Sequence, residues 1–417
     1  MKHVNGTPRA RAAGPLLFTL IALFACAAPS KKNAATPARS AVPAVATPAT
    51  STTATPVIGA PAPAAPVEPQ PFDLGREDIR AFIEDLSKRQ GIPEAEIRAL
   101  LAQGMYQPRI IAAITRPAET VLRWWEYSNR LVTPERIARG VEFARLHRDR
   151  LESAHEKSGV APAYVTAIIG IETNYGRNKG SWRVIDALMT LGFDYPPRGK
   201  FFRSELEQFL LLVREESLNP LTTLGSYAGA MGAPQFMPSS YRRFAVNGTL
   251  DGATDPRRDL FEQWDDVISS VANYFAVNGW ERDAPVLLDV AATPETLATV
   301  MPTLERRNLE LNETAASARA KGFAVPESVT DETRVILVPA ELADRPNVRV
   351  GLRNFQVITR YNRSILYAMA VHDLAMAIET ELLRSPAPTP APTSAPTLAP
   401  APSASTTESP ATVGTPR

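Results

Sequence analysis

One glutamate stands at the end of an apolar stretch, where a charged side chain is unexpected. Residues 161–172 read APAYVTAIIGIE, and Val165, Ile168, Ile169 and Glu172 follow the spacing of one helix face. A carboxyl group on such a face loses hydration, which favours its neutral form and raises its pKa. A raised pKa is what a general acid needs near neutral pH. The pattern therefore makes Glu172 a candidate proton donor.

The same pattern also fits a structural role for this glutamate. Glu172 could pair with Arg177 or accept a hydrogen bond from a nearby backbone donor, since ion pairs also perturb such groups. Asn174 and Gly176 are residues that end helices, so we expect Glu172 in the last turn. Taken alone, this segment favours the structural role.

A second segment combines small residues with polar and aromatic ones. Residues 225–241 read GSYAGAMGAPQFMPSSY, and the glycines and alanines let a backbone approach a ligand closely. Six side chains of the segment offer a hydroxyl, an amide or a flat ring: Ser226, Tyr227, Gln235, Phe236, Ser239 and Tyr241. This composition is typical of a site that binds sugars, because rings stack on pyranose faces and amides bind N-acetyl groups. A glycine-rich junction between packed helices is the alternative.

Helical patterns surround these two segments. Apolar residues recur at helical spacing over 76–90, 133–159, 199–217, 265–279 and 362–384. Between 284 and 360 the runs APVLLDVA, TRVILVPA and VRVGLRNFQVITRY are rich in β-forming residues. We therefore expect a mainly α protein, α+β in class, with a helical body and a small β-containing insertion.

The two ends have the composition of targeting and linker segments. Residues 1–25 have a basic start and the apolar run PLLFTLIALFA, which predicts a lipoprotein signal peptide, with a lipoprotein box ending at Cys26. Cys26 is the only cysteine, so it suits lipid attachment better than a disulfide. Ordinary secretion with cleavage nearby is the alternative. Residues 26–71 and 385–417 are rich in Ala, Pro and Thr, which predicts a tether and a disordered tail flanking a domain at 72–384.

The overall charge is balanced, with 45 Lys and Arg residues against 44 Asp and Glu residues. A chain without an excess of positive charge lacks the electrostatic footprint of a nucleic-acid-binding protein. We therefore expect no nucleic acid as a partner.

Five segments in order resemble the membrane-bound lytic murein transglycosylase B family, over most of residues 75–384. They are IIGIETNYG, LMTLGFDYPPRGKFFRSELEQFLLL, GSYAGAMGAPQFMPSSY, SVANYFAVNGW and FQVITRYNRSILYAMAV. The resemblance implies a lysozyme-like core that cleaves the β-1,4 bond between N-acetylmuramic acid and N-acetylglucosamine in peptidoglycan. The product would be a 1,6-anhydromuramoyl end, formed without water and without a required cofactor.

The resemblance also implies roles for individual residues. Glu172 would be the single general acid and base, Ser226 would bind the acetamido group or Glu172, and Arg198 would meet carboxylates of the lactyl group or stem peptide. Six further residues would contact the glycan through a ring, a hydroxyl or an amide: Tyr127, Gln235, Tyr274, Tyr361, Asn362 and Tyr367.

Residues 247–259, NGTLDGATDPRRD, resemble part of an EF-hand loop. Asn247, Thr249 and Asp251 fall at positions 1, 3 and 5, but position 12 carries Arg258 where a bidentate acid belongs. Asp266 could replace that acid from further along the chain. Some members of the family carry a calcium loop here, but the altered position 12 favours a plain surface turn over a Ca²⁺ site.

Three functions remain open at this point. A lytic transglycosylase is the leading one, and a water-using muramidase would need a second carboxyl, for which Asp186 and Asp194 are candidates. A non-catalytic peptidoglycan-binding lipoprotein that recruits other cell-wall enzymes is the third. In each case we expect the periplasm and a lipid anchor, with the outer membrane favoured because Ala27 stands where an Asp would favour inner-membrane retention.

Overall fold

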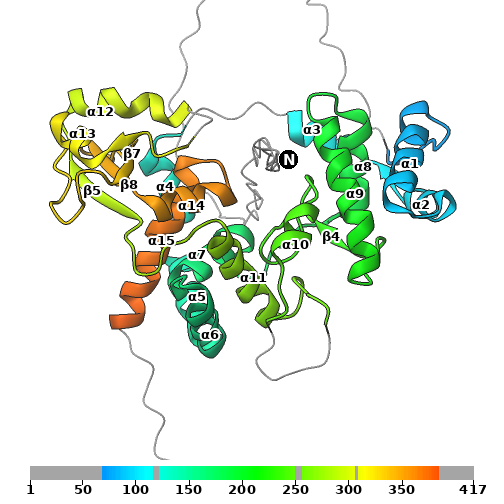
Figure 1. Ribbon diagram of the computed structural model, residues 1–417, viewed down its shortest axis with the longest axis horizontal. Helices are drawn as coiled ribbons and strands as arrows, with labels where there is room; N and C mark the ends of the chain where they lie inside the picture. Colours follow the sequence, from blue (N-terminus) through cyan, green and yellow to red (C-terminus); the bar gives the residue numbers. More distant parts are fainter. Residues whose placement is uncertain (1–67, 116–121, 249–255, 306–308, 385–417) are drawn as a thin grey trace, which may run out of the picture.

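The computed structural model describes residues 68–115, 122–248, 256–305 and 309–384. Helices dominate these residues and the strands form small sheets (Figure 1), so the predicted mainly α class is confirmed. The predicted signal peptide, Cys26, nearly all of the tether and the C-terminal tail lie outside them. The last residues of the predicted tether differ from the expectation, because Gln70–Pro71 forms strand β1 and pairs with β2 (Met105–Tyr106).

Helix α7 (Pro162–Thr173), which carries Glu172, lies at the centre of the helical body. Every residue from Ala163 to Gly170 is buried, because helices pack around α7 on several sides. Those neighbours are α5 (Pro134–Leu146), α6 (Arg148–Ser158), α11 (Trp264–Val277) and α15 (Ile365–Arg384). A helix that is apolar all round is stable only when it is enclosed in this way.

A second group of helices is built on the pair α8 (Val184–Asp194) and α9 (Gly199–Glu215), seen at the right of Figure 1. The other helices of this group are α1 (Glu77–Gln90), α2 (Glu94–Leu101), α3 (Pro108–Thr115) and α10 (Pro238–Phe244). The short strands β3 (Trp182–Arg183) and β4 (Leu224–Gly225) pair antiparallel. That pairing brings the chain after Glu172 beside the start of the glycine-rich segment.

A four-stranded antiparallel sheet forms the β part, in the order β5-β8-β7-β6. Its strands are β5 (Leu287–Ala291), β6 (Glu313–Thr314), β7 (Arg334–Pro339) and β8 (Asn347–Gly351). Helices α12 (Pro294–Val300) and α13 (Ala315–Ala320) and the 3₁₀ turn Met301–Glu305 pack on this sheet and enclose a second, smaller hydrophobic core. All four strands fall within the expected range 284–360. Helices α4 (Trp124–Leu131) and α14 (Arg353–Tyr361) pack against α15.

Two of the sequence predictions about elements were wrong. Residues 133–159 form two helices, because the backbone leaves helical geometry at His147 (φ −111°, ψ 25°). The break buries the His147 ring 4.4 Å from Phe143 and 5.2 Å from Trp264, measured between ring centres. The run 348–361 is a strand only as far as Gly351 and then becomes α14, since a short apolar run does not separate strand from helix by its pattern.

Candidate active site

Glu172 occupies the last turn of α7 and keeps some contact with solvent. Its Oε1 accepts a 2.6 Å hydrogen bond from the Tyr367 hydroxyl of α15. Desolvation by the surrounding protein raises the pKa of Glu172 to about 7, and the Tyr367 hydrogen bond opposes part of that rise. The alternative pairing with Arg177 is not seen, because no ion pair joins these two described residues. Glu172 can therefore exchange a proton near neutral pH.

The chain turns sharply directly after Glu172. Asn174, Tyr175 and Gly176 all have positive φ, at 50°, 60° and 79°, and for a bulky residue such as Tyr175 this backbone conformation is rare. The turn folds the Tyr175 ring back onto α7, where a Cβ at Gly170 would come within 2.6 Å of that ring. The predicted helix stop is confirmed, and the glycine in IIGIE is explained by this close approach.

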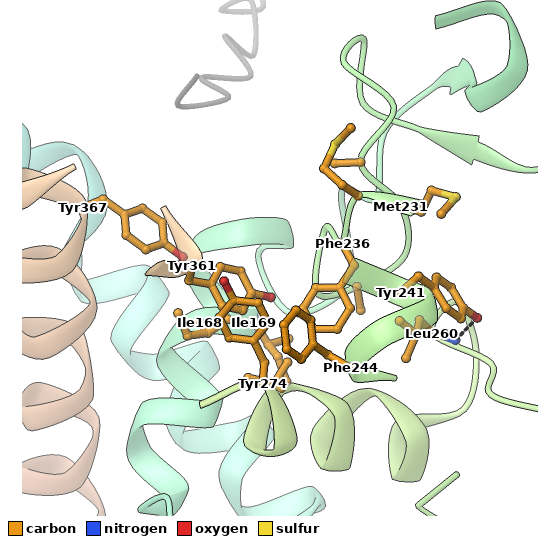
Figure 2. Packing of buried hydrophobic residues seen from close by; sticks show 14 of the residues in the cluster. Ile168, Ile169, Met231, Phe236, Tyr241, Phe244, Leu260, Tyr274, Tyr361 and Tyr367 are labelled. Carbon is orange, nitrogen blue, oxygen red and sulfur yellow. Dashed lines mark hydrogen bonds between the residues drawn. The ribbon is translucent and has the colours of Figure 1, made fainter. Parts of the chain in front are cut away.

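Tyrosine side chains from three helices gather around the carboxyl group. The charge of Glu172 contributes to raising the pKa of Tyr127 from α4, of Tyr361 from α14 and of Tyr367, although burial is the largest cause in each case. The Tyr361 hydroxyl donates to Pro234 O at 2.5 Å, which links α14 to the glycine-rich segment. Figure 2 shows Tyr367 and Tyr361 beside Ile168 and Ile169 of α7.

The glycine-rich segment is held against the turn that follows Glu172. The Thr173 hydroxyl donates to Ala233 O at 2.8 Å, and the Gln235 amide donates to Lys179 O at 3.1 Å. Ser226 Oγ accepts from the backbone N–H groups of Ala228 and Ala230, so it shapes the loop. Thr173 and Lys179 were missed by the sequence analysis. The one feature of the sequence that could have indicated them is their position on either side of the turn after Glu172.

Several aromatic and polar residues of the segment belong to the core. The expectation that Phe236 and Tyr241 offer free ring faces to a sugar was wrong, because these side chains are 2% and 0% exposed. Figure 2 shows both rings in the packed interior. Ser239 also has a structural partner, since its hydroxyl donates to Glu205 at 2.7 Å. Tyr227 alone of the three rings stays partly exposed.

Three other predicted contact residues, Tyr274, Asn362 and Arg198, lie on or next to three different helices. Tyr274, on α11, is buried, with its ring centre 4.8 Å from that of Tyr361, and its hydroxyl donates to Arg360 O. Asn362 follows α14 directly, and its buried Oδ1 has no hydrogen-bond partner among the described residues. Arg198 precedes α9, with its guanidinium 4.4 Å from the ring centre of Phe201.

The two candidates for a second catalytic carboxyl have structural partners. Asp186 is 2% exposed and accepts from Arg183, from Met105 N and from the Gln107 amide. Asp194 pairs with Arg76 at 2.9 Å. Both carboxylates therefore serve packing between elements, and neither contacts Glu172 in the structure.

The candidate calcium loop is described only in part, since Thr249 and Asp251 lie outside the described residues. Asp266 accepts from Gly248 N through one carboxylate oxygen and from Asp259 N through the other, each at 2.7 Å. The Asn247 amide donates to Arg257 O at 3.0 Å. Within 68–384, apart from the gaps given above, no group of three or more His, Cys, Asp or Glu residues is placed to hold a metal ion.

Comparison with known proteins agrees with this architecture. Residues 75–376 match the Transglycosylase SLT domain. The chain is 34% identical over 308 residues to membrane-bound lytic murein transglycosylase B of Escherichia coli K12, covering 71% of this chain and 81% of that protein. Catenated lytic transglycosylase SltB1 of Pseudomonas aeruginosa is 40% identical with a TM-score of 0.69, covering 74% and 98% of the two chains. Escherichia coli Slt35, solved in complex with calcium, is 31% identical with a TM-score of 0.65, covering 76% and 97%.

The mainly helical architecture with small sheets is the lysozyme-like fold of the lytic transglycosylases that the chain matches. The chain belongs to the SLT transglycosylase family and is a lytic murein transglycosylase, an enzyme that cleaves peptidoglycan. One relative is named as membrane-bound. Among the described residues, no helix combines the length and apolar character that crossing a membrane requires.

Proposed function

We propose that Glu172 alone supplies both proton transfers of the lytic reaction. The observation that supports this most strongly is a carboxyl group with a pKa near 7 and a neutral hydrogen-bond donor as its partner. Near neutral pH a large share of the enzyme holds this group protonated, and the group gives up its proton at little cost. A carboxylate locked in an ion pair would lack that property.

The reaction begins with Glu172 protonating the glycosidic oxygen between N-acetylmuramic acid and N-acetylglucosamine. The C1–O bond breaks, and the muramoyl acetamido group stabilises the positive charge at C1. The ionised Glu172 then removes the proton from the C6 hydroxyl, whose oxygen bonds to C1 and closes the 1,6-anhydro ring. Intramolecular attack gains from proximity, and no water is consumed. The carboxyl ends the cycle protonated, as it began.

The tyrosines around Glu172 set the properties of its carboxyl group. Tyr367 orients Oε1 and stabilises the ionised form, while Tyr127 and Tyr361 exclude water from it. Tyr274 supports Tyr361 by ring contact. We assign ring or hydroxyl contacts with the glycan to the accessible edges of this group.

Polar residues of the site bind the substrate. The Oδ1 atom of Asn362 is buried and unpaired, so an N–H group of the glycan is the partner it needs. Ser226 and Gln235 give a hydroxyl and an amide next to the backbone that they order, and they bind acetamido or hydroxyl groups. Arg198, stacked on Phe201, binds a carboxylate of the lactyl group or stem peptide.

We also infer the cellular setting from the N-terminal segment. A lipid on Cys26 holds the enzyme in the periplasm, at the outer membrane, where it reaches glycan strands and other cell-wall enzymes. The membrane-bound relative supports this placement. Labelled palmitate should enter the parent protein but not a Cys26→Ala variant, and equal labelling of the two proteins would reject the anchor.

The decisive experiment compares Glu172→Gln with the parent on purified peptidoglycan. Glutamine keeps the shape and an acceptor for Tyr367 but cannot donate a proton to the leaving oxygen. We expect the release of soluble fragments to fall by about 10³-fold or more. Mass spectrometry of the parent's products should show anhydromuramoyl ends, which are one water lighter than hydrolytic ends.

The matched control is Asp194→Asn, which removes a carboxylate that the structure uses only for packing. We expect it to retain nearly full activity. The proposal is contradicted if Glu172→Gln digests peptidoglycan at the parent rate. It is also contradicted if Asp194→Asn is as inactive as Glu172→Gln and the parent releases hydrolytic products. A parent that binds the polymer without cutting it would favour the scaffold alternative.

A further inference from the structure

The loop that corresponds to an EF-hand does not carry the charge pattern that calcium needs. Slt35, a relative of this chain, was solved in complex with calcium. Here position 12 of the loop is Arg258, a fixed positive charge where a bidentate carboxylate closes a calcium site. Asp266, the candidate replacement, already has one backbone N–H group on each carboxylate oxygen. These described residues therefore do not fit a bound calcium ion.

Arg258 instead forms hydrogen bonds with Glu216 and with the backbone of Arg242. Its backbone N–H group donates to Glu216 Oε2 at 2.8 Å and its Nε donates to Glu216 Oε1 at 2.6 Å. The Glu216 side chain is 5% exposed, so an unpaired charge there would be costly. Nη1 of Arg258 also donates to Arg242 O at 3.3 Å, which ties the loop to α10. One guanidinium thus joins three separate stretches of chain.

A continuous set of hydrogen bonds leads from Arg258 to the catalytic turn. Arg258 O accepts from the Tyr241 hydroxyl, whose oxygen accepts from Leu260 N at 3.2 Å. Leu260 O accepts from Ala233 N at 2.9 Å, and Ala233 O accepts from Thr173 Oγ1. Thr173 is the residue next to Glu172. The dashed line in Figure 2 marks the bond between Tyr241 and Leu260.

A second connection runs in parallel. The Lys179 ammonium donates to Phe261 O and pairs with Glu262 at 2.8 Å, while the carbonyl of the same lysine accepts from Gln235. The turn 258–262 therefore supports both the glycine-rich segment and the chain that follows Glu172. Contacts that hold the turn 258–262 in place therefore also hold the end of α7 in place.

We propose that Arg258 acts as a built-in cation in place of calcium, and that through the turn 258–262 it positions Glu172 for proton transfer. Arg258 is a positioning residue, since it acts on Glu172 only through the residues between them. The proposal rests on the role of Glu172 given above. It predicts an enzyme whose activity and stability are independent of calcium, and dependent on the pair formed by Arg258 and Glu216.

The test uses Arg258→Ala, Arg258→Lys and the control Arg242→Ala, at a temperature well below unfolding. The Arg242 side chain of α10 pairs with Glu215 at the end of α9, while Arg258 contacts only the backbone O of Arg242, so truncating Arg242 removes an arginine without freeing the turn. We expect Arg258→Ala to lower kcat about 10-fold with little change in KM, because small misplacements of a catalytic group are costly. Arg258→Lys should recover part of the loss, and Arg242→Ala should match the parent.

Two further readouts separate positioning from simple stability. In Arg258→Ala the basic limb of the pH–rate profile should move to lower pH, because a loosened α7 end admits water and lowers the pKa of Glu172. The parent should keep the same kcat and melting temperature in CaCl₂ and in EDTA.

An Arg258→Ala protein that melts at a lower temperature but keeps the parent's kcat and pH profile overturns the positioning role. A parent that EDTA inactivates and Ca²⁺ restores overturns the replacement of the metal. Neither result depends on the Glu172→Gln outcome, so the two proposals fail separately.

Discussion

Two carboxylates in consecutive helices, Glu172 of α7 and Asp186 of α8, are both partly or fully removed from solvent but have different hydrogen-bond partners. Asp186 accepts hydrogen bonds from a guanidinium, a backbone N–H group and an amide, so a cation and two further donors surround its carboxylate. Glu172 accepts one bond from a neutral hydroxyl and forms no ion pair with the described residues, and its pKa rises to about 7. Burial with compensation fixes a charge, whereas burial with little compensation leaves a group that titrates near neutrality.

The comparison also separates stability from chemistry. Asp186 joins β2, the start of α3 and α8, and it contributes to how these elements pack. Glu172 costs the fold stability when it is ionised, because the single hydrogen bond from Tyr367 offsets only part of the desolvation of its charge. A side chain retained in spite of such a cost is a candidate for function rather than for packing. Substitutions that change stability but not activity, or activity but not stability, test this distinction.

The largest effect on stability is expected from Asp186→Ala. The change leaves Arg183 and two backbone or amide donors without their acceptor, and breaking a buried pair in this way costs about 3–5 kcal/mol of unfolding free energy. Urea unfolding measures the loss. The rate of the folded fraction should stay within about 3-fold of the parent, since Asp186 does not touch the site. A matched control, Asp194→Ala, removes a partly exposed pair and should cost about 1 kcal/mol or less. Equal losses from the two variants would contradict the contrast between the carboxylates.

The sequence could predict Glu172 on a buried face, since helix periodicity is a local property of APAYVTAIIGIE. The stop at Asn174 followed from residue type in the same way. The partner Tyr367 lies 195 positions away and was named only through a family resemblance. The inward packing of Phe236 and Tyr241 was missed, because the composition of a glycine-rich segment does not say which rings other helices cover.

Other features also depend on contacts between distant segments. The break at His147 follows from burying its ring on Trp264, more than 100 positions further along the chain. Asp186 was an open candidate for catalysis until its partners in β2 and beside it were known. Element types in strongly periodic segments are thus predictable, while partners and the exposure of single side chains need the packed structure.

A second effect concerns the stability of Glu172→Gln at different pH. The pKa of Glu172 is about 4.5 in an unfolded chain and about 7 in the fold, so the folded parent holds the proton more tightly. Its stabilising contribution is present in full below pH 4.5 and is lost as the pH rises through 7. Glutamine does not titrate. The unfolding free energy of Glu172→Gln minus that of the parent should therefore be about 2 kcal/mol larger at pH 8 than at pH 5. Urea unfolding of both proteins at both pH values measures this, and a difference that does not vary with pH would show that Glu172 has no raised pKa.

The smallest and most specific effect is expected from Tyr367→Phe. The Tyr367 hydroxyl lowers the pKa of Glu172 against the larger effect of burial, so its removal should raise that pKa further. Activity needs protonated Glu172 and falls as the pH rises through its pKa. The basic limb of kcat/KM should consequently move to higher pH, although the maximal rate should decline because Oε1 loses its orienting donor. Tyr361→Phe is the matched control, since that hydroxyl donates to Pro234 O and not to the carboxyl group. If both variants shift the limb equally, the hydrogen bond from Tyr367 is not what tunes the acid, and general exclusion of water by the tyrosines explains its pKa instead.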